Sequence, residues 1–483
     1  DYKLKEFLAS TNGVLKIPKR CTEISFRCFE YVDYIENVIM QDGLLKVNSQ
    51  AFIYCSNLKS VYVPKSVSYI SNGCVFEECK NLEKIEVDSE NQRYSSQDGV
   101  LYNKEKTELI AAPGKIETCN IPDTVKIIGN CSFSSCKNLK SVNIPEGVTD
   151  IKNRAFEDCS SLSNVTFPNT LKNIDMYAFF SAAISGKLVI PDSVESIGNS
   201  SFSNCTNISK VIIGNSLKTI SGTSGIDYNA FEFCSNLKEF EVKSGNSYFS
   251  SQDGILYSKD KSKLILAPYG YEVNDLYVPN GVKEIGDYSF INCSKIKGSL
   301  YLPEGLISIG RQSFSYCGIS GEVNIPSSVI SINRNSFLGV ENVTKINVNS
   351  NNLNYSSQDG ILYNKDKTEL IKAPEGLTIN NLTLPDSLKV IDNSALSDCR
   401  NITGTLTLND NLETIKESAF YGCSGISGTV VMPESVKTVE GLIFRSCGGI
   451  QNIKCRATSK PDGWNNDWKY GCKATVEWGY TGD

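Results

Sequence analysis

The residue types that most often carry catalysis or hold metals are unevenly represented in this chain. Its 483 residues include 18 cysteines and no histidine. Histidine is the commonest general base and metal ligand, and it is the usual partner of a nucleophilic serine or cysteine. The sequence also lacks a Cys-x-x-Cys pair, a phosphate-binding loop and a nucleophile elbow. We therefore expect no catalytic residue, no metal site and no cofactor.

Three aspartates recur in an identical setting, as the middle residue of Gln-Asp-Gly. They are Asp98, Asp253 and Asp359. A carboxylate beside backbone carbonyls could bind calcium. Asp-Gly is also a turn sequence, because glycine adopts a positive φ without strain. We favour the turn.

An internal repeat must position these side chains. A phenylalanine in the phrase Ala/Ser-Phe recurs, mostly every 23 or 24 residues. The recurring positions are Phe29, Phe52, Phe76, Phe133, Phe156, Phe179, Phe202, Phe231, Phe290, Phe314, Phe337, Phe420 and Phe444, with Leu396 in one copy. The consensus is Leu-x-x-Val-x-Ile-Pro, then Val-x-x-Ile, a short polar stretch and Ala/Ser-Phe-x-x-Cys. A fixed period of this length indicates a solenoid.

Each copy predicts one coil of that solenoid. The Val-x-Ile phrase has the alternation of a short strand with one buried face, and the following proline ends the strand. Phe and Cys three residues apart would lie on one face of a tight helical turn and point inward. One coil cannot bury its apolar side chains alone, so coils should stack with parallel strands about 4.8 Å apart. The length of the chain therefore predicts one elongated domain.

Three longer intervals between the phenylalanines contain a nearly identical phrase. It reads YSSQDGVLYNKEKTELIAAP from Tyr94, YFSSQDGILYSKDKSKLILAP from Tyr248 and YSSQDGILYNKDKTELIKAP from Tyr355. In each copy two short apolar runs flank a polar turn, which predicts a β-hairpin. We expect modified coils with hairpin inserts near residues 89–113, 244–268 and 350–374, in which the Phe turn is replaced.

These phrases resemble the BspA-type leucine-rich repeats, a 23-residue class known from bacterial and protozoan surface proteins. The resemblance runs from about Val14 to Tyr480 and includes the ending CRATSKPDGWNNDWKYGCKATVEWGY, which holds all three tryptophans. It implies export to the cell surface and a role in adhesion or recognition, not catalysis. With the residues, it predicts an α/β repeat solenoid, a right-handed coil with a parallel β-sheet on one side. We expect a lead-in at residues 1–13, the solenoid at 14–455 and an aromatic cap at 456–483.

Eleven cysteines share one position, three residues after the repeat phenylalanine. They are Cys55, Cys79, Cys136, Cys159, Cys205, Cys234, Cys293, Cys317, Cys399, Cys423 and Cys447. Other copies have Val32, Ala182 or Val340 there, so the position needs a small apolar group. Successive copies should lie about 5 Å apart, whereas a disulfide needs Cβ atoms about 3.8 Å apart, so we expect free thiols. Cys455 and Cys472 flank the cap and are the pair best placed for a disulfide if one is present.

The outward side of the predicted strands is the candidate binding surface. Its residues are the middle residue of each Val-x-Ile phrase: Tyr62, Glu86, Asn143, Thr166, Val189, Ile212, Glu241, Tyr277, Tyr301, Asn324, Asn347, Thr383, Thr407 and Val431. Tyr277 and Tyr301 fall on neighbouring coils and could stack on a sugar or anchor a protein partner, although tyrosine also simply favours strands. We take Tyr62, Tyr277 and Tyr301 as candidate ligand-binding residues.

Composition narrows the choice of partners. The net charge of −6 and pI near 5.2 argue against nucleic acid, and no apolar run is long enough to span a membrane. The start, DYKLKEFLAS, is not a signal peptide, and we expect that the signal was removed from a mature form. We expect a monomeric, non-enzymatic extracellular or cell-surface protein that binds a host or neighbour-cell protein or glycan. The alternatives are a structural spacer that presents another module and a carbohydrate-active enzyme.

Overall fold

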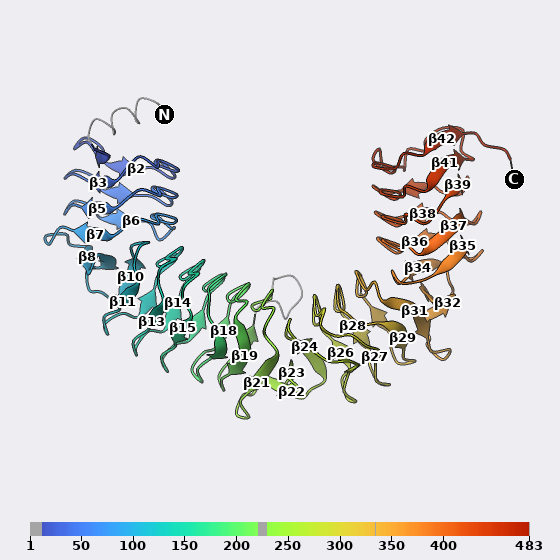
Figure 1. Ribbon diagram of the computed structural model, residues 1–483, viewed down its shortest axis with the longest axis horizontal. Coiled ribbons are helices and arrows are strands. Elements are labelled where there is room, and N and C mark those ends of the chain that lie inside the picture. The colour runs from blue at the N-terminus through green and yellow to red at the C-terminus, as the bar shows by residue number, and fades with distance from the viewer. Residues whose placement is uncertain (1–11, 221–228, 334, 483) are drawn as a thin grey trace. The chain divides into compact units, whose positions relative to one another are not determined.

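A computed structural model describes residues 12–220, 229–333 and 335–482. The chain divides into two compact units, residues 1–259 and 260–483, and each consists of stacked coils (Figure 1). Every regular coil has two short strands and a segment of turns. The predicted solenoid with parallel strands is confirmed, but the described residues contain no helix, so the α/β class is corrected to an all-β solenoid. Residues 1–11 of the expected lead-in lie outside the described residues, and a single continuous solenoid over 14–455 stays a prediction.

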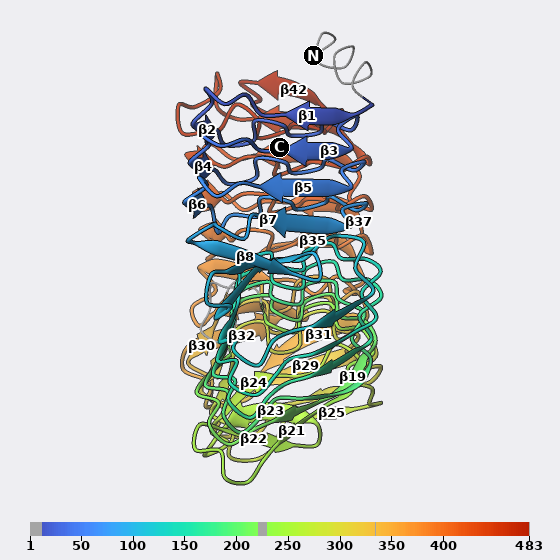
Figure 2. The same ribbon diagram turned by 90° about the vertical axis from the view of Figure 1, so that its left-hand side faces the viewer.

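The Val-x-Ile phrase of each coil forms a strand, and these strands, here together called the main sheet, fall into several short hydrogen-bonded sheets within each unit. The strands pair in parallel, so that Val38 lies opposite Val61 of the next coil, as Figure 2 shows for β1, β3, β5 and β7. In the first unit the strands are β1 (Val14–Lys16), β3 (Asn37–Ile39), β5 (Ser60–Val63), β7 (Lys84–Val87), β11 (Thr118–Asn120), β13 (Ser141–Asn143), β15 (Asn164–Thr166), β17 (Gly186–Val189), β19 (Ile208–Ile213) and β21 (Glu239–Val242). In the second unit they are β25 (Leu276–Tyr277), β27 (Leu300–Tyr301), β29 (Gly321–Ile325), β31 (Val343–Val348), β35 (Ile379–Thr383), β37 (Ile402–Thr407), β39 (Gly428–Met432), β41 (Ile450–Cys455) and β42 (Thr475–Trp478).

A second set of parallel strands corrects the expectation of a sheet on one side only. In regular coils the Val-x-x-Ile phrase forms a two-residue strand whose second residue, usually isoleucine, faces the core, while the inserts contribute four-residue strands. The strands in the first unit are β2 (Glu23–Ile24), β4 (Lys46–Val47), β6 (Tyr69–Ile70), β10 (Glu108–Ala111), β12 (Ile127–Ile128), β14 (Asp150–Ile151), β16 (Asn173–Ile174), β18 (Ser196–Ile197) and β20 (Thr219–Ile220). In the second unit they are β24 (Lys263–Leu266), β26 (Glu284–Ile285), β28 (Ser308–Ile309), β30 (Ser331–Ile332), β34 (Glu369–Lys372), β36 (Val390–Ile391), β38 (Thr414–Ile415) and β40 (Thr438–Val439).

The segment around each repeat phenylalanine, here called the turn ladder, replaces the predicted helical turn. In the coil of Phe52, the residues two before and two after it, Gln50 and Tyr54, have φ of 55° and 60°. These left-handed residues interrupt helical geometry. The N–H groups of Gln50, Phe52 and Tyr54 donate to the next coil at 2.8–3.1 Å, whereas Ile53 and Cys55 donate within their own coil at 3.1 and 3.2 Å. Three of these five hydrogen bonds therefore join coils, which a helix could not provide.

The core is a row of stacked phenylalanine rings. Phe133, Phe156, Phe179 and Phe202 are fully buried, and successive ring centroids are 4.8, 4.9 and 5.3 Å apart. In the second unit the same spacing is 5.2–5.4 Å for the rings of Phe290, Phe314 and Phe337. The inward orientation of the repeat phenylalanine is confirmed. Phe29, in the first coil of the stack, is only half-buried.

Each insert forms more structure than the predicted hairpin. In the first, β8 (Tyr94–Gln97) and β9 (Val100–Asn103) pair antiparallel, and β9 also pairs antiparallel with β10 of the second sheet. The turn between β8 and β9 is Asp98-Gly99, with φ of 53° and 79°, so the turn interpretation of Gln-Asp-Gly is confirmed. The other hairpin strands are β22 (Phe249–Gln252), β23 (Ile255–Ser258), β32 (Tyr355–Gln358) and β33 (Ile361–Asn364).

The C-terminal aromatic residues cover the last coil of the second unit. Trp464 and Trp468 are 3% and 4% exposed, and the Trp468 ring meets Phe444 at 6.5 Å between centroids. The indole of Trp464 donates a hydrogen bond to Val436 O at 3.1 Å. The strand β42 adds to β41 in parallel. The row of phenylalanines therefore ends against tryptophan rings.

Candidate functional site

Tyr277 and Tyr301 form an exposed stacked pair on the outward side of the main sheet, here called the strand face. They lie opposite one another on the paired strands β25 and β27. Their ring centroids are 4.4 Å apart at an interplanar angle of 3°, and the residues are 64% and 46% exposed. The structure therefore brings two of the three predicted binding residues together. Since each ring covers one face of the other, the pair presents its outer ring faces, ring edges and hydroxyls to a partner.

The hydroxyl of Tyr277 is neutral at pH 7, as a phenol normally is. Desolvation raises the pKa of Tyr277, and the neighbouring Tyr301 and Asp275 add to the effect. A neutral phenol can donate and accept a hydrogen bond. The pair thus offers polar atoms at the rim of an apolar surface, which is a common feature of interface tyrosines.

Tyr62, the third predicted binding residue, lies in the first unit and is not part of this pair. It is 36% exposed, and its hydroxyl donates to the Asp88 carboxylate at 2.9 Å. This hydrogen bond raises the pKa of Tyr62. In turn, the N–H of Glu90 and the hydroxyl of Tyr62 lower the pKa of Asp88. Asp88 was missed from the sequence because it follows the strand of the next coil, one residue beyond the Val-x-Ile register.

Charged groups of the strand face are largely paired with one another. Lys210 Nζ lies 2.6 Å from Glu239 and 2.7 Å from Glu241, and Lys345 lies 3.0 Å from Glu322. Exposed ion pairs of this kind contribute little to stability. Their effect here is that each lysine offsets negative charge beside it on the strand face. Ile212, predicted to face outward, is only 7% exposed, which corrects that assignment. It lies in register between Val189 and Glu241, and the Lys210–Glu241 pair borders it.

An open pocket of about 480 Å³ lies where the first insert interrupts the main sheet. Its lining includes Asp98, Tyr102, Lys115, Glu117 and Cys119. Burial raises the pKa of Cys119 to about 12 and also raises the pKa of Tyr102. A thiol that stays protonated is a poor nucleophile, so Cys119 is not activated for covalent catalysis.

The cysteines of the turn ladder are free, as predicted, and they have a polar contact that the sequence did not reveal. All eleven are unbridged and buried. Most donate their thiol to the carbonyl of the repeat residue one coil earlier, as Cys205 does to Phe179 O at 3.1 Å and Cys423 to Leu396 O at 2.9 Å. The ladder position thus combines apolar packing with a hydrogen bond. Cys455 and Cys472, the predicted candidates for a disulfide, are both free.

Two features of the side-chain arrangement were missed. Cys74 and Cys131 form a disulfide; both stand two residues before a repeat phenylalanine, and that shared position was the available signal. Tyr31 and Tyr54 form a second exposed stack on the turn ladder, with ring centroids 4.5 Å apart at 2°. Each stands two residues after its repeat phenylalanine. The shared position of these two tyrosines in the repeat was the signal that could have predicted their contact.

Comparison with known proteins agrees with the fold. A sequence model described as "BspA type Leucine rich repeat region (6 copies)" matches residues 7–108, 107–224, 268–379 and 375–460. The chain belongs to the BspA-type leucine-rich repeat family. No curated protein matches this BspA-type chain. The described residues include no helix long and apolar enough to cross a membrane.

Several solved structures are similar to this BspA-type chain. A leucine-rich repeat protein from Eubacterium ventriosum has 18% identity and a TM-score of 0.42, with 94% of both chains covered. A leucine rich cell surface protein from Faecalibacterium prausnitzii has 18% identity and a TM-score of 0.34, with 95% of this chain and 90% of that chain covered. One from Bacteroides ovatus, a leucine-rich repeat protein, has 17% identity and a TM-score of 0.34, with 97% and 92% covered. At this level of identity the likeness concerns the fold alone.

Proposed function

We propose that this BspA-type chain is a non-enzymatic binding protein of the cell surface or extracellular space that engages a protein partner through its strand face. The observation that carries the proposal is the exposed, mutually stacked pair Tyr277 and Tyr301. A stacked repeat presents such residues on a regular surface, which limits the ordering required when a large partner binds. The repeat family supports a scaffold role.

Two features favour a protein over a glycan. The stack leaves only one face of each ring open to a sugar, because the facing sides are in contact. The exposed edges and hydroxyls suit the mixed apolar and polar contacts of a protein interface, where tyrosine is enriched among residues that dominate affinity. Paired charges on the surrounding strand face disfavour a polyanionic partner.

The test compares two tyrosine pairs in the same chain. Purified chain is screened against extracellular-matrix proteins and, separately, against a glycan array. For a protein that binds, Tyr277→Ser/Tyr301→Ser is expected to weaken affinity by about tenfold or more. The matched control is Tyr31→Ser/Tyr54→Ser, which removes an equivalent stack from the turn ladder and should leave affinity unchanged.

Other outcomes would change the proposal in distinct ways. Equal affinity of the parent and the Tyr277→Ser/Tyr301→Ser variant would remove this patch as the contact. Binding only to glycans would replace the class of partner. Turnover of a glycan or peptide by the pure chain, abolished by one substitution, would overturn the non-enzymatic assignment. We also propose a monomer, which sedimentation of the purified chain would test.

A further inference from the structure

The first and third inserts leave a small cavity at the same place in the fold. Each modified coil lacks a repeat phenylalanine, and its Ala-Pro segment bridges the missing rung of the turn ladder. Ala112 N donates to Ser132 O at 2.7 Å, and Ala373 N donates to Ala395 O at 2.8 Å. A cavity of about 20 Å³ lies beside each segment. A space of this size can hold a water molecule or an ion.

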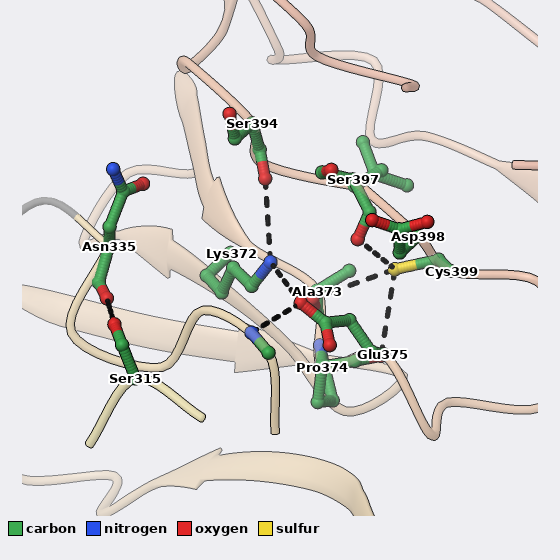
Figure 3. Close-up of polar contacts among 12 residues, drawn as sticks. Ser315, Asn335, Lys372, Ala373, Pro374, Glu375, Ser394, Ser397, Asp398 and Cys399 are labelled. Carbon is green, nitrogen blue, oxygen red and sulfur yellow. Dashed lines mark hydrogen bonds and ion pairs between the residues drawn. The ribbon is translucent and has the colours of Figure 1, made fainter. Parts of the chain in front are cut away.

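In the third insert a lysine side chain supplies a positive charge at the cavity. Lys372 lines the cavity and is 6% exposed. Its ammonium lies 3.4 Å from Ser394 O and 3.6 Å from the carboxylate of Glu375, as Figure 3 shows. Ser394 stands two residues before the repeat position of its coil. This position beside the Ala-Pro segment therefore accommodates a positive charge.

In the first insert the residue equivalent to Lys372 is Ala111, and no side-chain cation of the insert fills the cavity. Cys131 takes the place of Ser394, and Cys74 stands at the same position of the coil before the insert. Both line the cavity, and their Cα atoms are 5.1 Å apart. The carboxylate of Glu77 lies within 4.8 Å of both sulfurs. Two sulfurs that line the cavity and one carboxylate oxygen beside them are thus gathered where the third insert has a lysine.

A further polar group of the first cavity is without a partner. Ser134 lines the cavity and is 7% exposed, and its hydroxyl makes no hydrogen bond to any described residue. A buried hydroxyl is normally paired, so the Ser134 hydroxyl is available to bind a group placed in the cavity.

We propose that Cys74, Glu77 and Cys131 bind Zn²⁺ or a similar thiophilic cation when the Cys74–Cys131 disulfide is reduced. Reduction by a dithiol breaks the sulfur–sulfur bond and gives two protein thiols and one disulfide of the reductant. Zn²⁺ then replaces both thiol protons, which leave to water. Two thiolates and one carboxylate are a three-ligand zinc set, and the fourth position is open to water or to the Ser134 hydroxyl. The chain would exchange a covalent link between coils for a metal link at the same place.

The experiment uses the full chain with Cys21→Ser and Cys28→Ser, because these are the half-buried and exposed thiols outside the site. A water-soluble phosphine reduces the disulfide and is itself oxidised to the phosphine oxide, so no competing thiol is added. Zn²⁺ binding is measured by calorimetry, and Cd²⁺ is used to detect the ultraviolet band of a metal–thiolate bond. We expect one Zn²⁺ per reduced chain, none per oxidised chain, and a Cd²⁺–thiolate band only after reduction.

Matched variants distinguish this site from other thiols. Glu77→Gln should weaken Zn²⁺ binding by about tenfold or more, and Cys74→Ser should abolish it. The control is Glu232→Gln, because Glu232 also follows a repeat phenylalanine and, like Glu77, is half-buried. Since Glu77→Gln retains the disulfide, circular dichroism of its oxidised form checks folding separately. The proposal is overturned if the reduced chain binds no stoichiometric Zn²⁺, if binding survives Cys74→Ser, or if both glutamine variants lose affinity equally.

Discussion

The first and third inserts have almost the same sequence but fill the same gap with different chemistry. In the first, the Cys74–Cys131 disulfide joins the coils on either side, and Ala111 and Gly114 have no long side chain to place between them. A Cβ at Gly114 would lie 2.3 Å from Cys79 O, so the backbone itself occupies that region. The third insert has Lys372 and Glu375 at the equivalent positions, and both side chains are buried. The shared residues fix the strands and turns, while a few differing positions determine what stabilises the join.

The disulfide of the first insert and the ion pair of the third should respond differently to substitution. A disulfide acts mainly by restricting the unfolded chain, so its removal leaves no unsatisfied group in the folded state. A buried ion pair depends on both members, because removal of one leaves the other charged and desolvated. Glu375 also accepts a hydrogen bond from Gly339 N at 2.7 Å, so the pair supports the backbone of the preceding coil. The third insert should therefore be the more sensitive to a single substitution.

The largest effect is expected from Lys372→Met. It leaves the Glu375 carboxylate buried without its cation, which should lower the free energy of unfolding by about 3–5 kcal/mol. Since coils contact mainly their neighbours, urea unfolding followed by circular dichroism should show an early, separate transition. The control is Lys372→Leu/Glu375→Tyr, which copies Leu266 and Tyr269 of the second insert and should be close to the parent. A single variant as stable as this double variant would contradict the role of the pair.

Removal of the disulfide should have the next largest effect. Cys74→Ser/Cys131→Ser opens a loop of 57 residues and should lower the stability of the first unit by about 2–4 kcal/mol. Thermal unfolding by circular dichroism would measure this loss. Fluorescence of the three tryptophans, which all lie in the C-terminal part of the second unit, should not change. Phosphine reduction should shift the parent by a similar amount and leave the double variant unchanged; a parent insensitive to reduction would show that the bridge does not stabilise the coils.

A smaller effect distinguishes cysteines beside the inserts from those in regular coils. Cys205 donates to Phe179 O at 3.1 Å, whereas Cys136 and Cys399 follow an insert and reach the carbonyls of Pro113 and Pro374 only at 3.6 Å. Cys205→Ala should lose about 0.5–1.5 kcal/mol for the hydrogen bond in addition to the lost packing. Cys136→Ala and Cys399→Ala should lose less, and by similar amounts, in urea unfolding. A larger loss at either of them would show that the longer contacts matter more than their distances indicate.

The smallest effect extends the comparison to the strand face. Tyr62 and Asp88 border the first insert, and Asn324 and Asn349 stand at the equivalent positions of the third. The Asp88 carboxylate accepts a hydrogen bond from the Tyr62 hydroxyl, and this raises the pKa of Tyr62. Asp88→Asn should therefore lower the pKa of Tyr62 toward its ordinary value. Alkaline titration of the tyrosine ultraviolet band, with Tyr62→Phe as the reference, would detect the shift. Stability should change by only a few tenths of a kcal/mol because the pair is exposed. An unchanged Tyr62 titration would mean that Asp88 does not hold this hydroxyl in solution.

Much of the core could be predicted from the repeat because each coil has the same period. The inward phenylalanines and the free cysteines of the turn ladder followed from register alone, since a position that also accepts Val32, Ala182 or Val340 cannot require a bridge. The helical turn was wrong because Phe and Cys three residues apart fit both a helix and consecutive turns. Left-handed residues such as Gln50 and Tyr54, which select the turns, have no distinctive sequence.

The candidate site was predictable only in part. Tyr277 and Tyr301 were placed on neighbouring strands by the repeat, and the structure adds that they stack on one another. Tyr62 was predicted as a binding residue without its partner Asp88, because their contact depends on how the first insert leaves the strand. Ile212 was predicted to be exposed because alternation alone cannot account for cover from neighbouring side chains.

The sequence by itself determined the period, the alternation and the residue types that must be buried, and these fix a stacked β-solenoid because one coil cannot bury its own apolar face. Only the tertiary structure decided the contacts between coils that depend on distance and direction. The Cys74–Cys131 bridge and the thiol bonds to phenylalanine carbonyls join residues of different coils, and the Lys372–Glu375 pair forms where the fold buries both side chains. The repeat places residues at like positions in successive coils, but whether two side chains meet depends on their distance and direction in the folded chain.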